Sequence, residues 1–333
     1  MKKRNADAAT NDLSEKKCKS EFQHLHEFGY QVAPILQPGQ VEELVEIFDA
    51  DLASIGTGMK TNDVRTMDVR ARPGIASVGI LKDPKCGFAH SRSMWIARDA
   101  SANTFRDLLG ENEIVSSLDT GGLWPNWNLF KSAKDKKRNK TKSSWWHVDQ
   151  CLTNTDVCYQ GMLLLTDATI NTGGFAVVPG SHKRHADVLK AFGKDDSKSN
   201  FITLGTPEEA NVKLSGIGAE PIGGGLLVEA KAGSLILWNS KTMHTSIPGV
   251  NPGNEPVIRR VCYVSMVPRS HLTKKDDEFR RKAIVDEIST NHWCVRPKMK
   301  RETLAYPRHK SFPALKSAAM PMEEVFQKYS ELI

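Results

Sequence analysis

The strongest constraint on the fold is a series of short apolar segments between residues 121 and 268. Eight such segments are separated by Gly, Pro and Asn rather than by regular helical patterns. They are LWPNWNLF, WWHVD, YQGMLLLTDA, GFAVVPGS, GLLVEA, GSLILWN, MHTSIP and IRRVCYVSMV. Short strands with turn signals between them are typical of two packed antiparallel sheets. The sequence therefore predicts a mainly β fold with flanking helices, built on a jelly-roll or barrel core.

The segments on either side of this core have helical patterns. Residues 21–52 carry apolar side chains at helical spacing, interrupted by GYQVAPILQPG, which predicts a short strand, a turn and a helix start. Residues 95–109 form the best helical candidate before the core. We expect a disordered tail over 1–20 and a single domain over 21–333. Within it, the β core spans about 121–268, and a helical extension, 270–333, packs outside the sheet or caps an opening.

Several classes of protein do not fit the sequence. The chain has no run of 18 apolar residues, so a membrane-spanning helix is not expected. The basic start lacks the apolar stretch of a secretory signal, and the last residues are not a peroxisomal tripeptide. The six cysteines include no Cys-x-x-Cys pair, which is typical of reduced thiols. These features predict a cytoplasmic protein without a membrane partner.

The net charge of +7 is concentrated in one segment. Residues 131–142, KSAKDKKRNKTK, hold seven basic residues and one aspartate. A solvated, mobile loop is the simplest interpretation, and a patch that steers an anionic substrate is the main alternative. A localisation signal or a nucleic-acid contact is a further alternative. Because no basic helix or sheet with interleaved aromatic residues accompanies the segment, nucleic acid is not expected as a partner.

The most informative local motif is His147-Val148-Asp149 at the end of the WWHVD segment. Residues two apart on a strand point to the same face, so the imidazole and the carboxylate project together. Such a pair supplies two of the three ligands in the facial triad of non-haem iron(II) oxygenases. Alone, His-x-Asp is a weak signal, since a hydrogen-bonded pair without a metal is the commoner arrangement.

The second half of the pattern follows about a hundred residues later. His244 comes directly after the buried segment GSLILWN, where packing of one sheet on another can bring it beside the first pair. A β-branched strand then opens with Arg259 and Arg260. An arginine that faces the apolar interior needs an anionic partner, because a buried unpaired charge is costly. A bound carboxylate ligand would supply that partner.

These elements together resemble the phytanoyl-CoA dioxygenase family. The resemblance rests on His-x-Asp, GGFAVVPGSH at 173–182, GSLILW with its downstream histidine, and the arginine strand, in that order. The opening FQHLHEFGYQVAPILQPGQVEELVEIF is also similar, so the likeness runs from about residue 21 to 268. It implies a double-stranded β-helix, cupin-like in architecture, and an iron(II)- and 2-oxoglutarate-dependent dioxygenase that uses O2.

The resemblance also implies roles for individual residues. His147, Asp149 and His244 become the iron ligands. Arg259 becomes the partner of the distal carboxylate of 2-oxoglutarate, with Ser246 as a hydroxyl donor to the same group. Spacing alone does not decide between Arg259 and Arg260, and the family pattern favours the first of the pair.

Other polar and aromatic residues have weaker assignments. Asn128, expected on an alternating strand, contacts the oxoacid or makes a structural hydrogen bond. His182 and His185 are expected to be structural or surface histidines. Of Trp145 and Trp146, one is expected in the core and the other beside the substrate pocket.

The expected reaction is hydroxylation of a small-molecule or acyl substrate, with release of succinate and CO2. Halogenation is not expected, because related halogenases replace the metal-binding acid that Asp149 provides here. The sequence does not identify the substrate, although the basic segment points to an anionic one. Two alternatives stay open, a zinc-dependent hydrolase and a non-catalytic cupin-like binding protein. No general-base glutamate stands beside the first histidine, which counts against the hydrolase.

Overall fold

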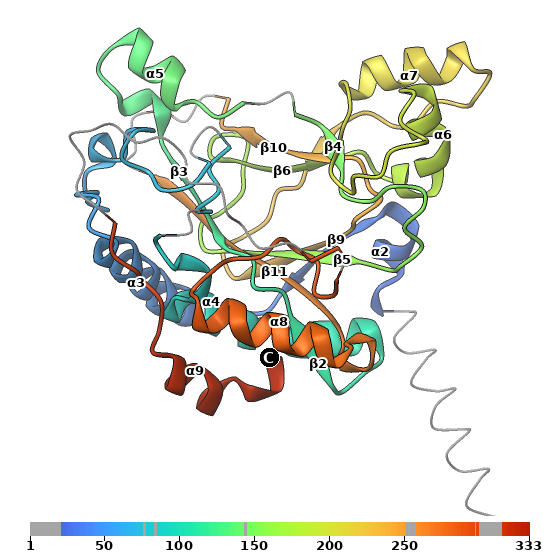
Figure 1. The fold of residues 1–333 in the computed structure, drawn as a ribbon. Coiled ribbons are helices and arrows are strands. Elements are labelled where there is room, and N and C mark those ends of the chain that lie inside the picture. The colour runs from blue at the N-terminus through green and yellow to red at the C-terminus, as the bar shows by residue number, and fades with distance from the viewer. Residues whose placement is uncertain are drawn as a thin grey trace, which may run out of the picture.

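Two facing sheets form the centre of the protein, and helices cover their outer faces (Figure 1). The computed structural model describes residues 21–75, 78–82, 85–142, 145–250, 253, 257–296, 298–299 and 315–333. The tail predicted over 1–20 lies outside the described residues. In the described part of the chain, no helix is both long enough and apolar enough to cross a membrane.

The larger sheet has six strands in the order β1-β9-β5-β11-β2, with β3 also paired to β11. The strands are β1 (Tyr30–Pro34), β2 (Ile114–Ser116), β3 (Gly121–Pro125), β5 (Tyr159–Leu164), β9 (Ser234–Asn239) and β11 (Ile258–Pro268). All the pairs between them are antiparallel. β11 is the longest, and its alternating side chains serve two environments, the space between the sheets and the helical layer outside.

The smaller sheet has five strands in the order β7-β4-β10-β6-β8. They are β4 (His147–Val148), β6 (Gly173–Val177), β7 (Ile202–Thr203), β8 (Leu226–Leu227) and β10 (His244–Pro248). Every pair here is antiparallel as well. Two facing antiparallel sheets confirm the predicted mainly β fold with a jelly-roll core.

Helices pack on both outer faces. Those associated with the larger sheet are α2 (Gln23–Phe28), α3 (Pro38–Ser54), α4 (Arg92–Leu109), α8 (Lys274–Val285) and α9 (Met322–Lys328). On the side of the smaller sheet lie α6 (His185–Ala191) and α7 (Pro207–Gly216), and α5 (Ala133–Asn139) joins β3 to β4. The helices predicted near 95–109 and after residue 269 are thus present.

Three buried clusters account for this layering. One joins the outer face of the larger sheet to α3 and α4, and another joins the smaller sheet to α6 and α7. The third fills the space between the sheets with Trp124, Met162, Phe175, Trp238 and their neighbours. Burial of these side chains supplies the main favourable free energy of the sandwich. The functional groups lie at the edge of this third cluster.

Two predictions from the sequence are wrong in detail. The segment expected as a strand around Asn128 ends as a strand at Pro125, and Asn128 lies in a 3-10 helix, Trp127–Leu129. The side chain of Asn126 caps that helix by accepting a hydrogen bond from the Asn128 N–H, which turns the chain away from the sheet. The segment 131–142, expected as a loop, contains α5. Ser132 caps this helix by accepting a hydrogen bond from the Asp135 N–H.

Candidate metal centre

Two neighbouring strands of the smaller sheet bring His147, Asp149 and His244 together. His147 on β4 and His244 on β10 are direct cross-strand partners, and Asp149 follows His147 by two residues on the same face. The N–H of Asp149 donates to the Ser240 carbonyl at 2.9 Å, which fixes the end of β4 against the β9–β10 connection. Pairing of strands therefore unites groups that are almost a hundred residues apart.

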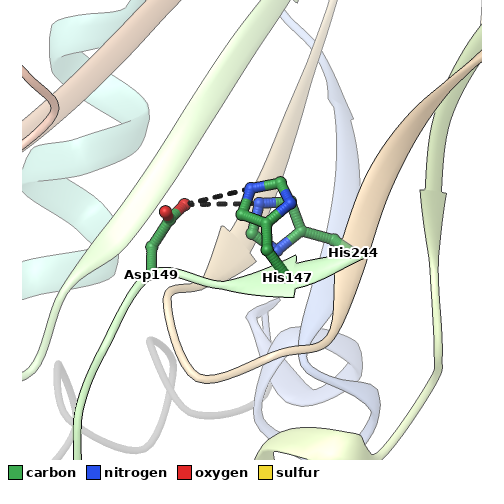
Figure 2. A group of neighbouring side chains, drawn as sticks. All are labelled: His147, Asp149 and His244. Carbon is green, nitrogen blue, oxygen red and sulfur yellow. Dashed lines mark ion pairs between the residues drawn. The ribbon is translucent and has the colours of Figure 1, made fainter. Parts of the chain in front are cut away.

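The three side chains converge on one small volume (Figure 2). Their ligand atoms all lie within 4.8 Å of one another, and all three residues are buried. Asp149 Oδ2 is 3.3 Å from His244 Nε2 and 3.8 Å from His147 Nε2. Among the described residues, this is the only group of three or more His, Cys, Asp or Glu side chains with such spacing.

Hydrogen bonds prepare both imidazoles for a metal. His147 Nδ1 lies 2.9 Å from the Trp145 carbonyl, and His244 Nδ1 lies 2.8 Å from the Thr242 carbonyl. A carbonyl only accepts, so each ring donates from Nδ1 and presents its Nε2 to the cluster. Burial lowers the pKa of His147 to about 3, which keeps its ring neutral.

Asp149 is held in its ionised form. Burial acts to raise the pKa of its carboxyl, but the imidazoles of His292, His147 and His244 lower it, and the net shift is downward. Gln160 on β5 donates from Nε2 to Asp149 Oδ2 at 2.8 Å. Two neutral nitrogens and one carboxylate oxygen, each with a supporting hydrogen bond, fit a divalent cation that prefers mixed N and O ligands.

The two arginines of β11 point in opposite directions. Arg260 faces outward and makes a bidentate ion pair with Asp49 of α3, at 2.7 and 2.8 Å. Arg259 faces the inter-sheet space, where its side chain is 3% exposed. The structure therefore answers which of the pair faces inward.

Arg259 is held in place by neutral groups. Its guanidinium stacks on the Trp124 ring at 3.9 Å, donates to Ser246 Oγ at 2.7 Å and donates to the Ile247 carbonyl at 3.0 Å. Within the described ranges no carboxylate forms an ion pair with it. Burial lowers the pKa of Arg259 to about 10, so the group is still a cation at neutral pH. A buried cation without a counter-charge favours the binding of an anion beside it.

Ser246 links this cation to the metal cluster. It lies two residues after His244 on β10, so the two side chains project from the same face of one strand. Arg259 bonds to Ser246, and Ser246 shares a strand face with His244, so a chain of direct neighbours connects the buried cation to the candidate ligands. The structure brings together five of the six residues singled out from the sequence.

The sixth, Asn128, lies elsewhere. Its Nδ2 donates to the Gly253 carbonyl and its Oδ1 accepts from Lys136 Nζ, each at 2.9 Å. Both ends of the amide are therefore engaged by the connections around α5. The Asn128 amide thus makes structural hydrogen bonds, which is one of the two alternatives that the sequence left open.

Aromatic rings flank the metal cluster. Trp145, which is partly buried, stacks on the His147 ring with centroids 4.8 Å apart, while Trp146 packs in the core of the smaller sheet. Phe201 contacts the same imidazole at 4.9 Å although it is 51% exposed. His182 and His185 bond to the backbone carbonyls of His26 and Gln150, as expected for structural histidines.

Sequence reasoning missed the polar residues on the side of the larger sheet. Lys82 and Asp119 form a largely buried ion pair at 3.0 Å. His292 of the C-terminal extension has a buried Nε2 without a hydrogen-bond partner, and it interacts electrostatically with Asp149 and Asp119. These residues come from three distant segments, and no local pattern marks them. Gln160 alone had a signal, as a polar side chain in a strand that is otherwise apolar.

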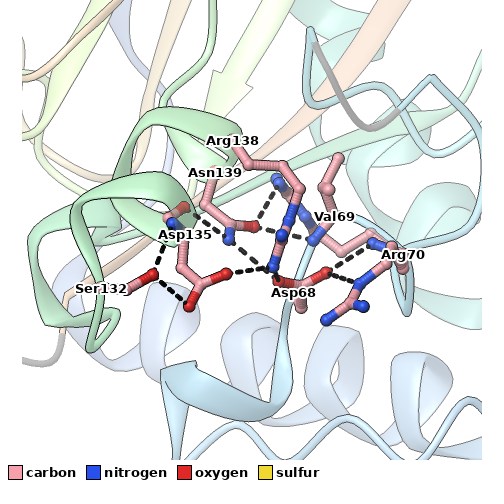
Figure 3. A network of polar contacts seen from close by, with 8 residues as sticks. Asp68, Val69, Arg70, Ser132, Asp135, Arg138 and Asn139 are labelled. Atoms are coloured by element: carbon pink, nitrogen blue, oxygen red, sulfur yellow. Dashed lines mark hydrogen bonds and ion pairs between the residues drawn. The ribbon is translucent and has the colours of Figure 1, made fainter.

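The basic segment forms a separate network around α5 (Figure 3). Arg138 bonds to both Asp68 and Asp135, and Arg70 bonds to Asp68 at 2.7 Å. Asn139, which is buried, accepts from the Val69 N–H at 2.7 Å and donates to Asp68 at 3.2 Å. Part of the positive charge therefore attaches α5 to residues 68–70, so a freely solvated loop is not what the segment forms.

Comparison with known proteins identifies a family. The model of the phytanoyl-CoA dioxygenase family matches residues 59–255, more than half of the chain. A protein from Aspergillus versicolor, "Ava biosynthesis cluster protein O", is 26% identical over 217 residues. That match covers 62% of this chain and 64% of the relative, so the chain spans less than two thirds of the relative's length.

Similar solved structures have low sequence identity. EctD from S. alaskensis, solved with 2-oxoglutarate and 5-hydroxyectoine, is 17% identical with a TM-score of 0.47, covering 91% of this chain and 88% of EctD. The non-haem α-ketoglutarate-dependent carbocyclase SnoK from nogalamycin biosynthesis is 14% identical with a TM-score of 0.46. That alignment covers 75% of this chain and 83% of SnoK.

Proposed function

Because the chain belongs to the phytanoyl-CoA dioxygenase family, we propose that it is an iron(II)- and 2-oxoglutarate-dependent dioxygenase. Its substrate is a small molecule or an acyl compound, which it hydroxylates. One molecule of O2 is consumed, one oxygen atom enters the substrate, and 2-oxoglutarate leaves as succinate and CO2. His147, Asp149 and His244 hold the metal, and Arg259 with Ser246 binds the distal carboxylate of 2-oxoglutarate.

The observation that carries this proposal is the buried Arg259, which forms no ion pair with the described residues and bonds to Ser246 on the strand that carries His244. A three-ligand site alone is compatible with several metals and reactions. A cation that waits for a carboxylate beside that site is what a chelating oxoacid with a second carboxylate requires. The pairing of the two features favours 2-oxoglutarate over a simple water ligand.

The residues of this chain have distinct tasks in the reaction. Iron(II) and 2-oxoglutarate supply the oxidising chemistry once both are bound. His147, Asp149 and His244 would hold the metal through two imidazole nitrogens and one carboxylate oxygen. Gln160 orients Asp149, and the carbonyls of Trp145 and Thr242 orient the two imidazoles. The apolar cluster between the sheets excludes water from this centre.

The zinc hydrolase alternative has less support. A hydrolase would activate a metal-bound water with a nearby general base. No glutamate stands beside His147 in the sequence to act as that base, and Gln160, which bonds to Asp149, is an amide. Such an enzyme would also have no use for Arg259. The binding-protein alternative is weakened by the complete set of candidate ligands and their oriented tautomers.

The substrate and the cellular location stay proposals. We expect a small molecule and a cytoplasmic protein, as the sequence predicts. The anionic substrate suggested by residues 131–142 has weaker support, since Arg138 is engaged by Asp68 and Asp135. Asn128 is left out of the proposed site, because its amide is engaged by Gly253 and Lys136.

The test is an anaerobic titration of the iron(II)-loaded protein with 2-oxoglutarate, followed by the weak visible absorption band of the chelate. We expect the band to appear and to saturate with one equivalent bound. Absence of the band, although iron binds, would contradict the proposal and direct attention to zinc. Succinate release during a substrate screen then separates an active enzyme from a binding protein.

A further inference from the structure

Tyr263 on β11 is a polar residue of the inter-sheet space that neither the sequence analysis nor the proposed function uses. It follows Arg259 by four residues, so both side chains project from the same face of the strand. Its ring packs against the inter-sheet cluster. Its cross-strand partner is Met162 on β5, two residues from the Gln160 that bonds to Asp149. Tyr263 therefore lies along β11 between the rows of Arg259 and Gln160.

The phenol hydroxyl of Tyr263 is available to a ligand. The residue is only partly buried, and in the described part of the chain no hydrogen bond engages its hydroxyl. Burial raises the pKa of the phenol; Arg259 opposes this shift, and Asp119 and Asp149 add to it. The group is therefore a protonated donor at neutral pH, within electrostatic range of both the metal-binding acid and the buried arginine.

We propose that the Tyr263 hydroxyl donates a hydrogen bond to the distal carboxylate of 2-oxoglutarate, beside Arg259 and Ser246. This inference rests on the proposed function and adds a positioning residue to it. A carboxylate accepts about four hydrogen bonds, more than Arg259 can supply while it also bonds to Ser246 and Ile247. Tyr263 and Arg259 project from the same face of β11, which favours the carboxylate that Arg259 binds over the chelating end.

The experiment compares two probes that differ only at the distal end. 2-Oxoglutarate and 2-oxopentanoate have the same chain length and the same chelating group, but only the first has a distal carboxylate. Each is titrated anaerobically into iron(II)-loaded wild type, Tyr263→Phe and Tyr30→Phe, with the chelate band as readout. Tyr30 is the matched control, because it packs against the same cluster from β1 at the edge of the larger sheet.

We expect Tyr263→Phe to raise the dissociation constant of 2-oxoglutarate about tenfold, the effect of losing one hydrogen bond to a charged group. The dissociation constant of 2-oxopentanoate should change less than about twofold on the same scale, and Tyr30→Phe should change neither. Thermal melting of the metal-free variants checks that the ring alone preserves packing. An intact fold is expected, because the substitution removes one oxygen atom and keeps the ring.

Other outcomes overturn the inference in distinguishable ways. Equal weakening of both probes would put Tyr263 at the chelating end or in packing alone. No weakening of either probe would leave the hydroxyl without a role in oxoacid binding, while the proposed function would stand on the wild-type band. If wild type forms no band with 2-oxoglutarate although iron binds, the proposed function fails and this inference fails with it.

Discussion

The metal centre between the sheets and the α5 segment are both rich in charge, but their charges are partnered differently. Arg138 of α5 bonds to two carboxylates and has a partly exposed side chain. Arg259 is buried and bonds only to neutral groups among the described residues. The charge of Arg138 is balanced by carboxylates of the protein, whereas in the proposed function the charge of Arg259 is balanced by 2-oxoglutarate. An unpaired buried charge is therefore the better indicator of function.

In the sequence, by contrast, the α5 segment is the more conspicuous of the two regions. The segment 131–142 has the most conspicuous charge of the chain, while the residues of the metal centre are scattered over more than a hundred positions. Charge density along the chain reports where the surface is polar. Spacing on a strand reports which groups meet in the interior.

The largest effect is expected from loss of a metal ligand. His147→Ala removes one of three donors, and we expect iron(II) affinity to fall by at least about 100-fold. The chelate band with 2-oxoglutarate should disappear at the same time. His271→Ala, an exposed histidine in the 3-10 helix Arg269–His271, is the control and should leave the band unchanged. A band of normal intensity in His147→Ala would break the assignment of the centre.

The two neighbouring arginines of β11 give the next largest contrast. Arg259→Ala should raise the dissociation constant of 2-oxoglutarate about 100-fold, because two charge-assisted hydrogen bonds are lost. Arg260→Ala should leave it unchanged, but should lower the free energy of unfolding by about 1–3 kcal/mol through loss of the Asp49 pair. Band titrations and urea unfolding separate the two effects. The reverse result would mean that Arg260 is the oxoacid partner.

Acid should weaken the two regions in different pH ranges. Burial lowers the pKa of His185, which bonds to the Gln150 carbonyl beside the metal strand, to about 4. The unfolded chain binds this proton below about pH 6.5 and the folded protein does not. Stability of the metal-free protein therefore falls as the pH drops from about 6.5 to 4, by at most about 1.4 kcal/mol per pH unit from this group.

Asp68 beside α5 behaves differently. Burial acts to raise the pKa of its carboxyl, but hydrogen bonds from Arg70, Arg138 and Asn139 lower it, and the net shift is downward. Its contribution is complete above the unfolded pKa of about 3.9 and is lost only below it. Urea midpoints from pH 7 to 3 check both statements. His185→Asn should flatten the limb between pH 6.5 and 4, and Asp68→Asn only the limb below pH 4.

Truncation within α5 should affect stability without affecting chemistry. Arg138→Ala breaks the bonds to Asp68 and Asp135, and we expect the free energy of unfolding to fall by about 1 kcal/mol, because the side chains are partly exposed. In a protein of this size that lowers the melting temperature by about 1–2 °C. The dissociation constants of iron and 2-oxoglutarate should stay the same. A loss of oxoacid binding would mean that α5 contributes to the binding of 2-oxoglutarate.

The smallest effect is expected from the exposed lysines of α5. The double variant Lys134→Glu and Lys137→Glu reverses two solvated charges and leaves the Arg138 network intact. Once a substrate is identified, kcat/KM should change less than about twofold at physiological salt, where exposed charges are screened. A larger fall that grows at low ionic strength would restore the idea that this segment steers an anionic substrate.

Most of the fold could be predicted because its signals are local. The alternation along IRRVCYVSMV and the run SLILWN are strong enough to predict β11 and β9 without tertiary information. β2 and β7 were missed because they are only three and two residues long. α5 was not predicted, because the segment was interpreted from its charge alone. The spacing of Ser132 and Asp135 is nevertheless typical of a helix N-terminus.

The residues of the candidate site likewise divide into those with a local sequence signal and those without one. His147, Asp149 and His244 could be proposed from strand spacing and order along the chain, but the choice between Arg259 and Arg260 needed the position of α3. Tyr263 had a usable signal, since it lies an even number of residues from Arg259 on one strand. His292 had none, because its approach to Asp149 depends on the path of the C-terminal extension.

β10 carries both His244 and Ser246, and this single strand sets a length scale for the co-substrate. Side chains two residues apart on a strand are separated by about 7 Å. In the proposed function, this spacing along β10 would set the distance between the metal held by His244 and the carboxylate bound by Ser246. β10 would therefore select among 2-oxo diacids by their chain length. Oxaloacetate, one carbon shorter, would fall short of Arg259, and 2-oxoadipate, one carbon longer, would have to bend to fit.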